Sequence, residues 1–282
     1  MTTETPTLPE DTGRDTRVLA CTNGSAGSGK STTAAALAYA AAKKKKLVCV
    51  IGLDKQRDIS RLLGYDDPDG DEDLATMYDV VDKLVTLSEA VVPAKDSKTK
   101  EVIPDLWVVL ESKQLETLEF KLAGETAREL WLHRIIGALR GRFDLIIFDC
   151  PGDVKLATIA AIIASDEVVG CTKSQEKEAR GLTELEDKIA DVAAAYGHTG
   201  MPTGIDWVVV TEGVDHKSQG KVYKDMEDQL REAYGDIVVE TVCDDVKVPE
   251  AYTAGQPVTL FAPNCRAAKA YTKIGRQMKL YR

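Results

Sequence analysis

Gly24-Ser25-Ala26-Gly27-Ser28-Gly29-Lys30-Ser31 is the stretch that decides the fold of this chain, because it fits the pattern G-x-x-x-x-G-K-[ST]. Arg17–Thr22 before it is short, apolar and β-branched, as in a buried strand, and the Ala-rich run 31–45 after it is typical of a helix. A strand, a glycine-rich turn and a helix in this order predict a P-loop. A Gly/Ser-rich connector before a helix is the alternative, and the flanking strand and helix argue against it.

The residue types in this motif predict the chemistry of a phosphate site. Glycines leave room for backbone N–H groups to turn toward a polyphosphate, and the helix N-terminus adds partial positive charge. We expect Lys30 to meet the β- and γ-phosphates and the Ser31 hydroxyl to meet a Mg²⁺ ion. The expected nucleotide-binding residues here are Gly24, Ser25, Ala26, Gly27, Ser28, Gly29, Lys30, Ser31 and Thr32.

Composition describes a chain that can bury a sizeable core, since its 282 residues are 44% hydrophobic. The net charge of −10 argues against a surface coated for nucleic acid, although it permits a local basic patch. No apolar run approaches membrane-spanning length and no signal peptide opens the chain, so a cytoplasmic protein without a membrane partner is expected. Six cysteines without C-x-x-C spacing predict mostly buried thiols.

Alternating strand-like and helical runs predict the organisation of the rest of the chain. Residues 1–16 are rich in Thr, Pro, Asp and Glu and are expected to form a disordered tail, before a single domain at 17–282. The polar excursion from Pro93 to Pro104 is too short to be a separate domain. The predicted fold is α/β, a mostly parallel twisted sheet with helices on both faces. Beyond the first strand, the predicted strands are 47–53, 106–110, 145–149, 167–171, 207–211 and 237–242.

Two carboxylates follow predicted strands at the edge where ligands collect in open α/β sheets. Asp149 ends the apolar run 145–149 and is the candidate Walker B residue, which would hold Mg²⁺ next to Ser31. Asp54 follows the run 47–53 and is expected near the metal and the γ-phosphate, where it would orient the attacking water. The alternative for Asp54 is a solvated loop aspartate.

Four further segments resemble one protein family. Asp54-Lys55-Gln56 resembles a D-P-Q switch I element, and 143–151 resembles Y-D-x-[IV]-[IV]-x-D-x-P, a Walker B strand with switch II. Residues 164–169 resemble A-A-D-E-V-[IL], and 250–258 resemble E-A-…-G-[KQ]-P-V. Over 17–278 the chain therefore resembles a ParA-type partition ATPase of the deviant-Walker family, which includes MinD and the nitrogenase iron protein.

The resemblance implies a function and a set of partners. In that family ATP is bound between two subunits, and the resulting homodimer binds DNA without sequence preference. An adaptor such as a ParB-like protein stimulates the weak hydrolysis of ATP. The expected cofactors are ATP and Mg²⁺, and the expected location is the nucleoid in the cytoplasm. Thr211 and Cys243 complete the expected nucleotide-binding residues.

Departures from the family pattern are as informative as the matches. The family's P-loop reads K-G-G-x-G-K-T, whereas its first lysine, which reaches the other subunit's phosphates, is Ser25 here. The first Asp of the family's D-x-D-P-Q is Gly52, and an Arg that partition proteins often use on DNA is Asp244. Serine at the lysine position resembles a subgroup that positions carboxysomes. We expect Lys155, in a switch II-like turn, to replace the missing lysine in trans, and a surface lysine at a helix start is the alternative.

A basic stripe near the C-terminus is the candidate DNA face. Its spacing of i, i+3, i+7 and i+10 places it on one side of a helix, opposite a core-facing side with Ala267, Ala270, Ile274 and Met278. An ordinary solvated face is the alternative. The stripe consists of Arg266, Lys269, Lys273 and Arg276.

Two function classes remain open at this level. The first is a DNA-dependent positioning ATPase for a plasmid, chromosome or protein cargo. The second is a metabolic or redox P-loop ATPase without DNA binding. An iron-protein role needs paired cluster-ligating cysteines, and Cys150 has no matching second site. A MinD-like role needs a C-terminal amphipathic anchor, for which 277–282 is too short. The positioning ATPase is therefore expected.

Overall fold

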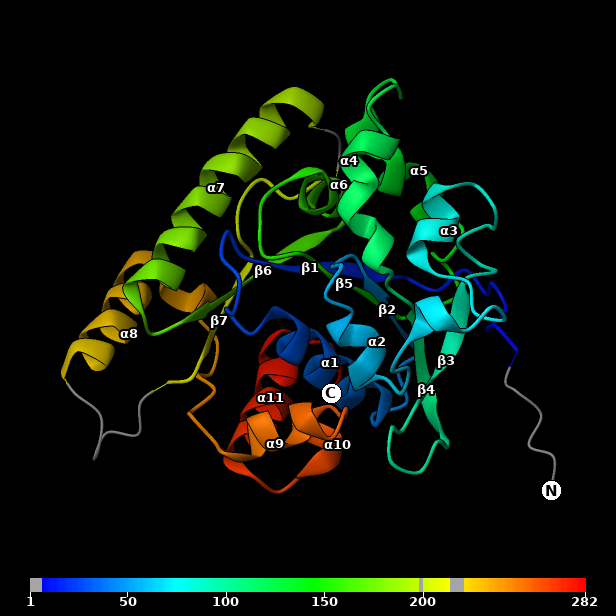
Figure 1. Ribbon diagram of the computed structural model, residues 1–282. Coiled ribbons are helices and arrows are strands. Elements are labelled where there is room, and N and C mark those ends of the chain that lie inside the picture. The colour runs from blue at the N-terminus through cyan, green and yellow to red at the C-terminus, as the bar shows by residue number, and fades with distance from the viewer. Residues whose placement is uncertain (1–6, 198–199, 214–220) are drawn as a thin grey trace.

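A twisted seven-stranded sheet forms the centre of the computed structural model, which describes residues 7–197, 200–213 and 221–282 (Figure 1). The strand order is β3-β4-β2-β5-β1-β6-β7, and every neighbouring pair is parallel except β3 with β4. This confirms the predicted mostly parallel α/β sheet. The strands are β1 Arg17–Thr22, β2 Val48–Gly52, β3 Val91–Lys95, β4 Val102–Val109, β5 Leu145–Asp149, β6 Glu167–Lys173 and β7 Trp207–Thr211.

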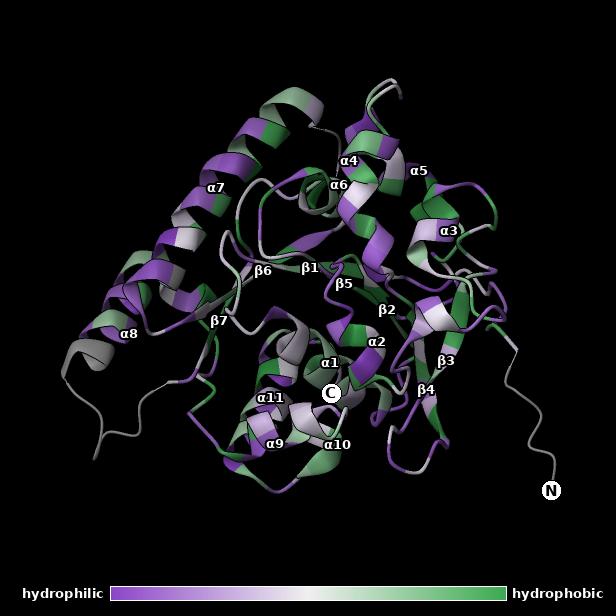
Figure 2. Ribbon diagram, viewed as in Figure 1, coloured by the Kyte–Doolittle hydropathy of each residue, from purple (hydrophilic) through white to green (hydrophobic). Residues whose placement is uncertain are grey.

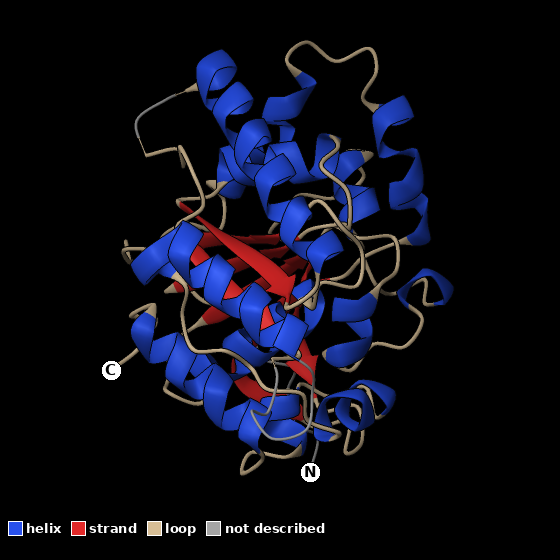
Figure 3. Ribbon diagram, turned by 90° about the vertical axis from the view of Figure 1, so that its left-hand side faces the viewer, coloured by secondary structure: helices blue, strands red, loops and turns tan. Residues whose placement is uncertain are grey.

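Helices cover both faces of this sheet (Figures 1 and 3). Side chains alternate along each strand, so that Leu19 and Cys21 of β1 join one core cluster and Val18 and Ala20 join another on the opposite face. Helices α1 and α11 pack on the first face, and α5, α6 and α7 on the second. The helices are α1 Lys30–Ala42, α2 Asp58–Leu62, α3 Met77–Val81, α4 Leu118–Lys121, α5 Trp131–Ile136, α6 Leu156–Ala164, α7 Glu176–Tyr196, α8 Lys221–Tyr234, α9 Lys247–Thr253, α10 Val258–Phe261 and α11 Arg266–Gln277.

Hydropathy follows these layers. Figure 2 shows hydrophobic residues along the central strands, whereas α7 and α8 are banded with hydrophilic residues. Helix α1 differs because it lies between the sheet and α11, and its alanine side chains are almost all buried. Small side chains let a third layer approach closely, and the Thr33 and Tyr271 hydroxyls of α1 and α11 lie 3.2 Å apart. The P-loop helix is therefore fixed from both sides.

At the edges of the sheet, one predicted strand is wrong and one observed strand was not predicted. Residues 237–242 are not a strand; single bridges join Val238 to Val208 and Cys243 to Gly213, and no continuous ladder forms. Strand β3 was not predicted, and the polar excursion from Pro93 to Pro104 lies within the antiparallel pair that β3 forms with β4. Proline has no N–H for a ladder, which counts against a strand, but β3 is an edge strand and has no second neighbour to bond.

The N-terminal segment also differs in part from the predicted disordered tail. Residues 1–6 lie outside the described residues, and for them the tail stays a prediction. Residues 7–16 pack on the domain: the N–H groups of Thr12 and Arg14 donate to the Gly141 carbonyl at 3.1 and 3.2 Å, and Leu8 contacts the core. The Thr16 hydroxyl donates to the Phe143 carbonyl at 2.7 Å.

Candidate nucleotide site

The P-loop joins β1 to α1 and is held by backbone contacts with two other segments. The Gly24 N–H donates to the Gly181 carbonyl of α7 at 3.3 Å, and a Cβ on Gly181 would lie 2.1 Å from Asn23 Oδ1. On the other side, a Cβ on Gly152 would lie 2.8 Å from Ala26 Cα. These close approaches need glycine, and they fix the loop between α7 and the turn after β5.

Lys30 is the first residue of α1 and only 6% exposed. Its ammonium donates to the Ser25 carbonyl at 3.0 Å and to Ser28 Oγ at 3.4 Å. The residue before it, Gly29, has φ 84° and ends the loop at the N-terminus of the helix. The buried cation is thus kept within the loop, where backbone N–H groups and the helix dipole also favour an anion.

Asp149 lies beneath this cation at the end of β5, in register with Cys21 of β1 and Gly52 of β2. It is completely buried, and within the described residues neither carboxylate oxygen has a hydrogen-bond partner. Burial raises the pKa of Asp149 well above its usual range, and the Glu111 carboxylate adds to the rise. The Ser31 hydroxyl is close enough to lower that pKa, although its geometry falls short of a hydrogen bond. A buried carboxylate left without a donor, beside a hydroxyl, fits a Mg²⁺ site.

Asp54 lies at the rim of the same site, just after β2. Its Oδ1 accepts a hydrogen bond from the Gln56 N–H at 3.0 Å, which fixes the turn. Burial raises the pKa of Asp54, while the Gln56 N–H and the positive charge of Lys30 oppose the rise. The carboxylate is partly buried and faces the pocket, which suits a group that accepts a proton or orients water.

A third carboxylate, Glu111, was not predicted from the sequence. It follows β4, is completely buried, and accepts hydrogen bonds from the Ser60 N–H at 2.7 Å and the Ser60 hydroxyl at 2.6 Å. A Cβ on Gly52 would lie 2.2 Å from Glu111 Cγ, so Gly52 is required there by this side chain. The side chain of Glu111 therefore fills the space beside Gly52, the position at which the family pattern has an Asp. Burial raises the pKa of Glu111 to about 8.

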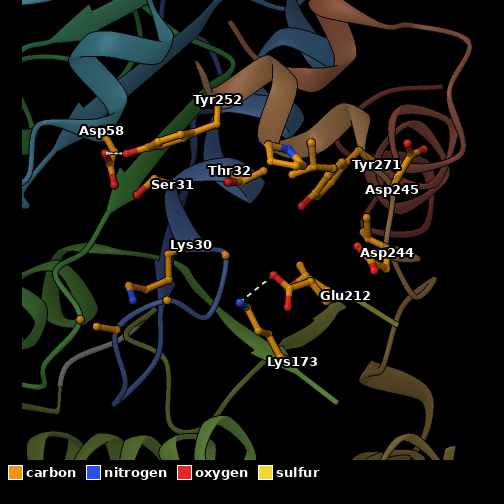
Figure 4. A pocket seen from close by; sticks show the side chains of 18 of the residues that line it. Lys30, Ser31, Thr32, Asp58, Lys173, Glu212, Asp244, Asp245, Tyr252 and Tyr271 are labelled. Carbon is orange, nitrogen blue, oxygen red and sulfur yellow. Dashed lines mark hydrogen bonds and ion pairs between the residues drawn. The ribbon is translucent and has the colours of Figure 1, made fainter. Parts of the chain in front are cut away.

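The pocket above the P-loop has a volume of about 430 Å³ and two chemically different ends (Figure 4). Its phosphate end is the P-loop with Asp54. Its other end, here called the base end, is formed by side chains that follow β6 and β7 and by α9. Thr211 and Glu212 come from β7 and the turn after it, and the Tyr252 hydroxyl of α9 donates to Asp58 Oδ1 at 2.6 Å. The base end consists of Lys173, Thr211, Glu212, Val242, Cys243, Asp244, Asp245, Val248, Pro249 and Tyr252.

Most of the predicted nucleotide-binding residues line this pocket. Gly24, Ser25 and Ser28 do not line it, because the first is tied to α7 and the other two are buried within the loop. Lys173 and Glu212 line the pocket without having been predicted, since the expected strand ended at Cys171 and β6 continues to Lys173. The predicted residues that line it are Ala26, Gly27, Gly29, Lys30, Ser31, Thr32, Asp54, Thr211 and Cys243.

Lys155 lies outside the pocket. It immediately precedes α6, its side chain is 65% exposed, and its ammonium is 3.1 Å from Asp153 Oδ2. That contact, followed by the charge of Glu119, raises the pKa of Lys155. The position on the exposed turn after β5 suits a contact with another molecule rather than with this chain's own nucleotide, so its role in trans stays a prediction.

The basic stripe lies on α11 as the spacing predicts. Arg266, Lys269, Lys273 and Arg276 are all exposed, whereas Ala267, Ala270, Ile274 and Met278 on the opposite side are buried. Lys273 forms an exposed ion pair with Glu240 at 2.6 Å, and Arg266 donates to the Asp244 carbonyl at 3.2 Å. The stripe is therefore a solvent-facing surface, and its affinity for DNA stays a prediction.

Comparison with known proteins agrees with this site. A family model described as an AAA domain matches residues 16–199. The chromosome partitioning protein ParA of Caulobacter vibrioides is 30% identical over 266 residues, which cover 93% of each chain. The chain belongs to the ParA family.

Two solved structures extend the likeness of this ParA-family chain to the level of the fold. A McdA–ATP complex of Cyanothece has a TM-score of 0.79 at 18% identity and covers 96% of this chain and 99% of McdA. MinD of Pyrococcus horikoshii, complexed with Mg-ADP, has a TM-score of 0.71 at 19% identity and covers 93% and 96%. Within the described residues, no helix of the chain is long and apolar enough to cross a membrane.

Proposed function

We propose that this ParA-family chain is an ATPase that dimerises on ATP, binds DNA without sequence preference, and partitions or positions a plasmid, chromosome or protein cargo such as carboxysomes. The single observation that carries the nucleotide chemistry is Asp149, a buried carboxylate beside Lys30 and Ser31 that has no hydrogen-bond donor among the residues that the structure describes. The ParA relative is named for chromosome partitioning, and the McdA and MinD structures contain ATP and Mg-ADP. ATP and Mg²⁺ are therefore the proposed ligands.

The side chains of the phosphate end have separate tasks in this proposal. Lys30 exchanges its loop acceptors for the β- and γ-phosphates, and Ser31 and Asp149 would hold Mg²⁺. The bound metal neutralises phosphate charge. Asp54 accepts a hydrogen bond from the attacking water and orients it toward the γ-phosphate. Hydrolysis by the free subunit is slow, because the charge clamp is completed by dimerisation and a stimulating adaptor.

Lys155 is the proposed cation of that clamp in trans. It is exposed on the turn after β5, and the Gly152 backbone of the same turn contacts Ala26 of the P-loop. A long flexible side chain at this place points out from the rim of the nucleotide site. The facing subunit would therefore receive a lysine there, in place of the family lysine that Ser25 lacks.

The proposed DNA face is the basic stripe on α11. Arg266 supports this proposal. Its guanidinium donates a hydrogen bond to the carbonyl of Asp244, so a cation lies close to the position at which partition proteins often have an arginine. At the other end of the helix a hollow of about 370 Å³ is lined by four cationic side chains and, within the part of the chain that the structure describes, by no acidic one. Gathering of cationic side chains on one surface of a chain whose net charge is −10 suits contact with the DNA phosphates of the nucleoid. These four side chains are Lys46, Arg276, Lys279 and Arg282.

Mobility shift on arbitrary duplex DNA, with and without ATP, tests the proposal. We expect a shift only with ATP, equal on unrelated sequences and falling steeply with salt. Neutralising Lys273 and Arg276 together is expected to weaken it similarly on every sequence. Neutralising Lys83 and Lys188, two ion-paired surface lysines on the other face, is the matched control and is expected to leave it unchanged. ATP turnover without any DNA shift would contradict the proposal and favour a metabolic ATPase.

A further inference from the structure

The charge balance of the nucleotide pocket is unfavourable for a polyphosphate. Within the described residues five acidic side chains line it, and only two lining side chains are cationic, Lys30 and Lys173. Lys30 is committed to the β- and γ-phosphates in the proposed function, on which the present inference rests. A bound nucleoside diphosphate or triphosphate therefore needs further positive charge near its remaining phosphate. The five acidic residues are Asp54, Asp58, Glu212, Asp244 and Asp245.

Strand pairing places Lys173 beside the P-loop. It ends β6, which pairs with β1 on one side and with β7 on the other, where Lys173 is in register with Thr211. Thr211 in turn lies against the start of α1, because a Cβ on Gly29 would be 2.9 Å from Thr211 Oγ1. Lys173 thus lies at the side of the base end that adjoins the phosphate end of the pocket. The α-phosphate of a nucleotide lies between its base and its β-phosphate, so it matches this position.

The side chain of Lys173 is held by one carboxylate. Its ammonium is 2.7 Å from Glu212 Oε1, and the two side chains are 20% and 49% exposed (Figure 4). Glu212 has φ 52°, a left-handed conformation that is uncommon for a residue with a Cβ. It is kept there by the turn after β7, where the Gly213 N–H donates to the Val242 carbonyl at 2.9 Å. The acceptor of Lys173 is therefore fixed by the backbone at the rim of the pocket.

A partly exposed ion pair of this kind is weak, whereas a phosphate offers several acceptor oxygens. We propose that Lys173 is a nucleotide-binding residue in cis that leaves Glu212 and contacts the α-phosphate, supplying within one subunit part of the charge absent at Ser25. Glu212 is its resting acceptor. Because ADP and ATP share the α-phosphate, Lys173 adds to the affinity for both nucleotides equally. A lysine that sensed the γ-phosphate would favour ATP alone.

Equilibrium titration with fluorescent ADP and ATPγS in Mg²⁺, on the full chain, tests this inference. Lys173→Gln is expected to weaken both nucleotides about tenfold by the same factor, which is the usual size of one charge-assisted contact. Lys173→Arg is expected to restore most of the loss. Glu212→Gln is expected to bind both nucleotides at least as tightly as the wild type. Lys188→Gln, which removes a charge from the surface of α7, is the matched control and is expected to change nothing.

Several outcomes would overturn the inference. Unchanged ADP affinity in Lys173→Gln, with an unchanged melting temperature, would remove Lys173 from the site. A loss confined to ATPγS would move its contact to the γ-phosphate, and weaker binding in Glu212→Gln would show that Glu212 itself serves the nucleotide. If Lys173→Gln fails to fold, the affinities of Lys173→Arg and Glu212→Gln for the two nucleotides decide instead. Near-wild-type binding is expected in Lys173→Arg and binding at least as tight as in the wild type in Glu212→Gln, and weaker binding in Glu212→Gln would overturn the inference. Failure of the wild type to bind either nucleotide would instead contradict the proposed function.

Discussion

The two ends of the nucleotide pocket are built in different ways. The phosphate end is a contiguous stretch of backbone fixed by glycine contacts, beside a buried carboxylate, Asp149, that has no hydrogen-bond donor within the described residues. The base end is assembled from side chains at and after the ends of β6 and β7 and from α9, and its cation Lys173 is already paired with Glu212. Ligand binding is therefore expected to supply missing partners to buried groups at the phosphate end. At the base end it is expected to replace an existing partner, as when Lys173 leaves Glu212 for a phosphate.

This difference predicts unequal sensitivity to substitution. A buried group that waits for a ligand contributes its full electrostatic interaction when the ligand arrives, whereas an exposed pair gives up one contact for another. Changes at the phosphate end are thus expected to have the larger effects on nucleotide binding.

The largest expected effect is that of Lys30→Ala. Lys30 is 6% exposed and is the cation nearest the loop carbonyls, so its loss is expected to weaken ADP and ATPγS binding at least about a hundredfold. Titration of a fluorescent nucleotide measures this directly. The loss is expected to exceed that of Lys173→Gln at the base end. Equal losses in the two variants would contradict the contrast between the two ends.

A second large effect is expected on assembly rather than on affinity. Lys155 lies outside the pocket, so Lys155→Ala is expected to keep nucleotide affinity within about threefold while leaving the ATP complex monomeric. Light scattering in an Asp54→Ala background, where hydrolysis is blocked, measures the mass. An unimpaired ATP-bound dimer would rule out Lys155 as the replacement for the missing lysine.

A smaller effect concerns stability and pH. Folding raises the pKa of Glu111 from 4.5 to about 8, so the folded state holds a proton that the unfolded state releases between these values. Stability from this group is fully present below pH 4.5 and is lost as pH rises through about 8, with a slope of up to ~1.4 kcal/mol per pH unit.

Urea unfolding from pH 5 to pH 8.5, without nucleotide or Mg²⁺, checks this linkage. Glu111→Gln keeps a side chain of similar shape and removes the titration, so its stability is expected to vary less with pH than that of the wild type. Parallel pH profiles for the two proteins would show that Glu111 does not hold the proton.

The sequence predicts the phosphate end well because its residues are adjacent in the chain. The P-loop, strand β5 and Asp149 follow from local patterns, and the structure places Asp149 within electrostatic reach of Lys30 and Ser31. Glu111 could not be predicted in this way. Its position depends on the register of β2 with β4, which brings it against Gly52.

The base end shows why a local pattern is insufficient. Lys173 is missed because the apolar run ends at Cys171, whereas hydrogen bonding to β7 extends β6 by two residues. The run 237–242 has the composition of a strand, but within the described residues it pairs with β7 through a single isolated bridge, Val238 with Val208. Pairing partners, rather than composition, decide these edges.

Asp54 is the residue on which the proposed catalysis depends most directly. It is partly buried at the rim of the pocket, and its Oδ1 accepts a hydrogen bond from the Gln56 N–H of its own turn, so its removal leaves the hydrogen bonds of Lys30 within the P-loop in place. The decisive measurement is phosphate release at saturating ATP, together with nucleotide affinity, for wild type, Asp54→Ala and the control Asp66→Ala on an exposed loop.

We expect Asp54→Ala to lose turnover by at least about a hundredfold while binding ATP within about threefold of the wild type. Asp66→Ala is expected to match the wild type in both. Equal turnover in Asp54→Ala and wild type at saturating ATP would contradict the account.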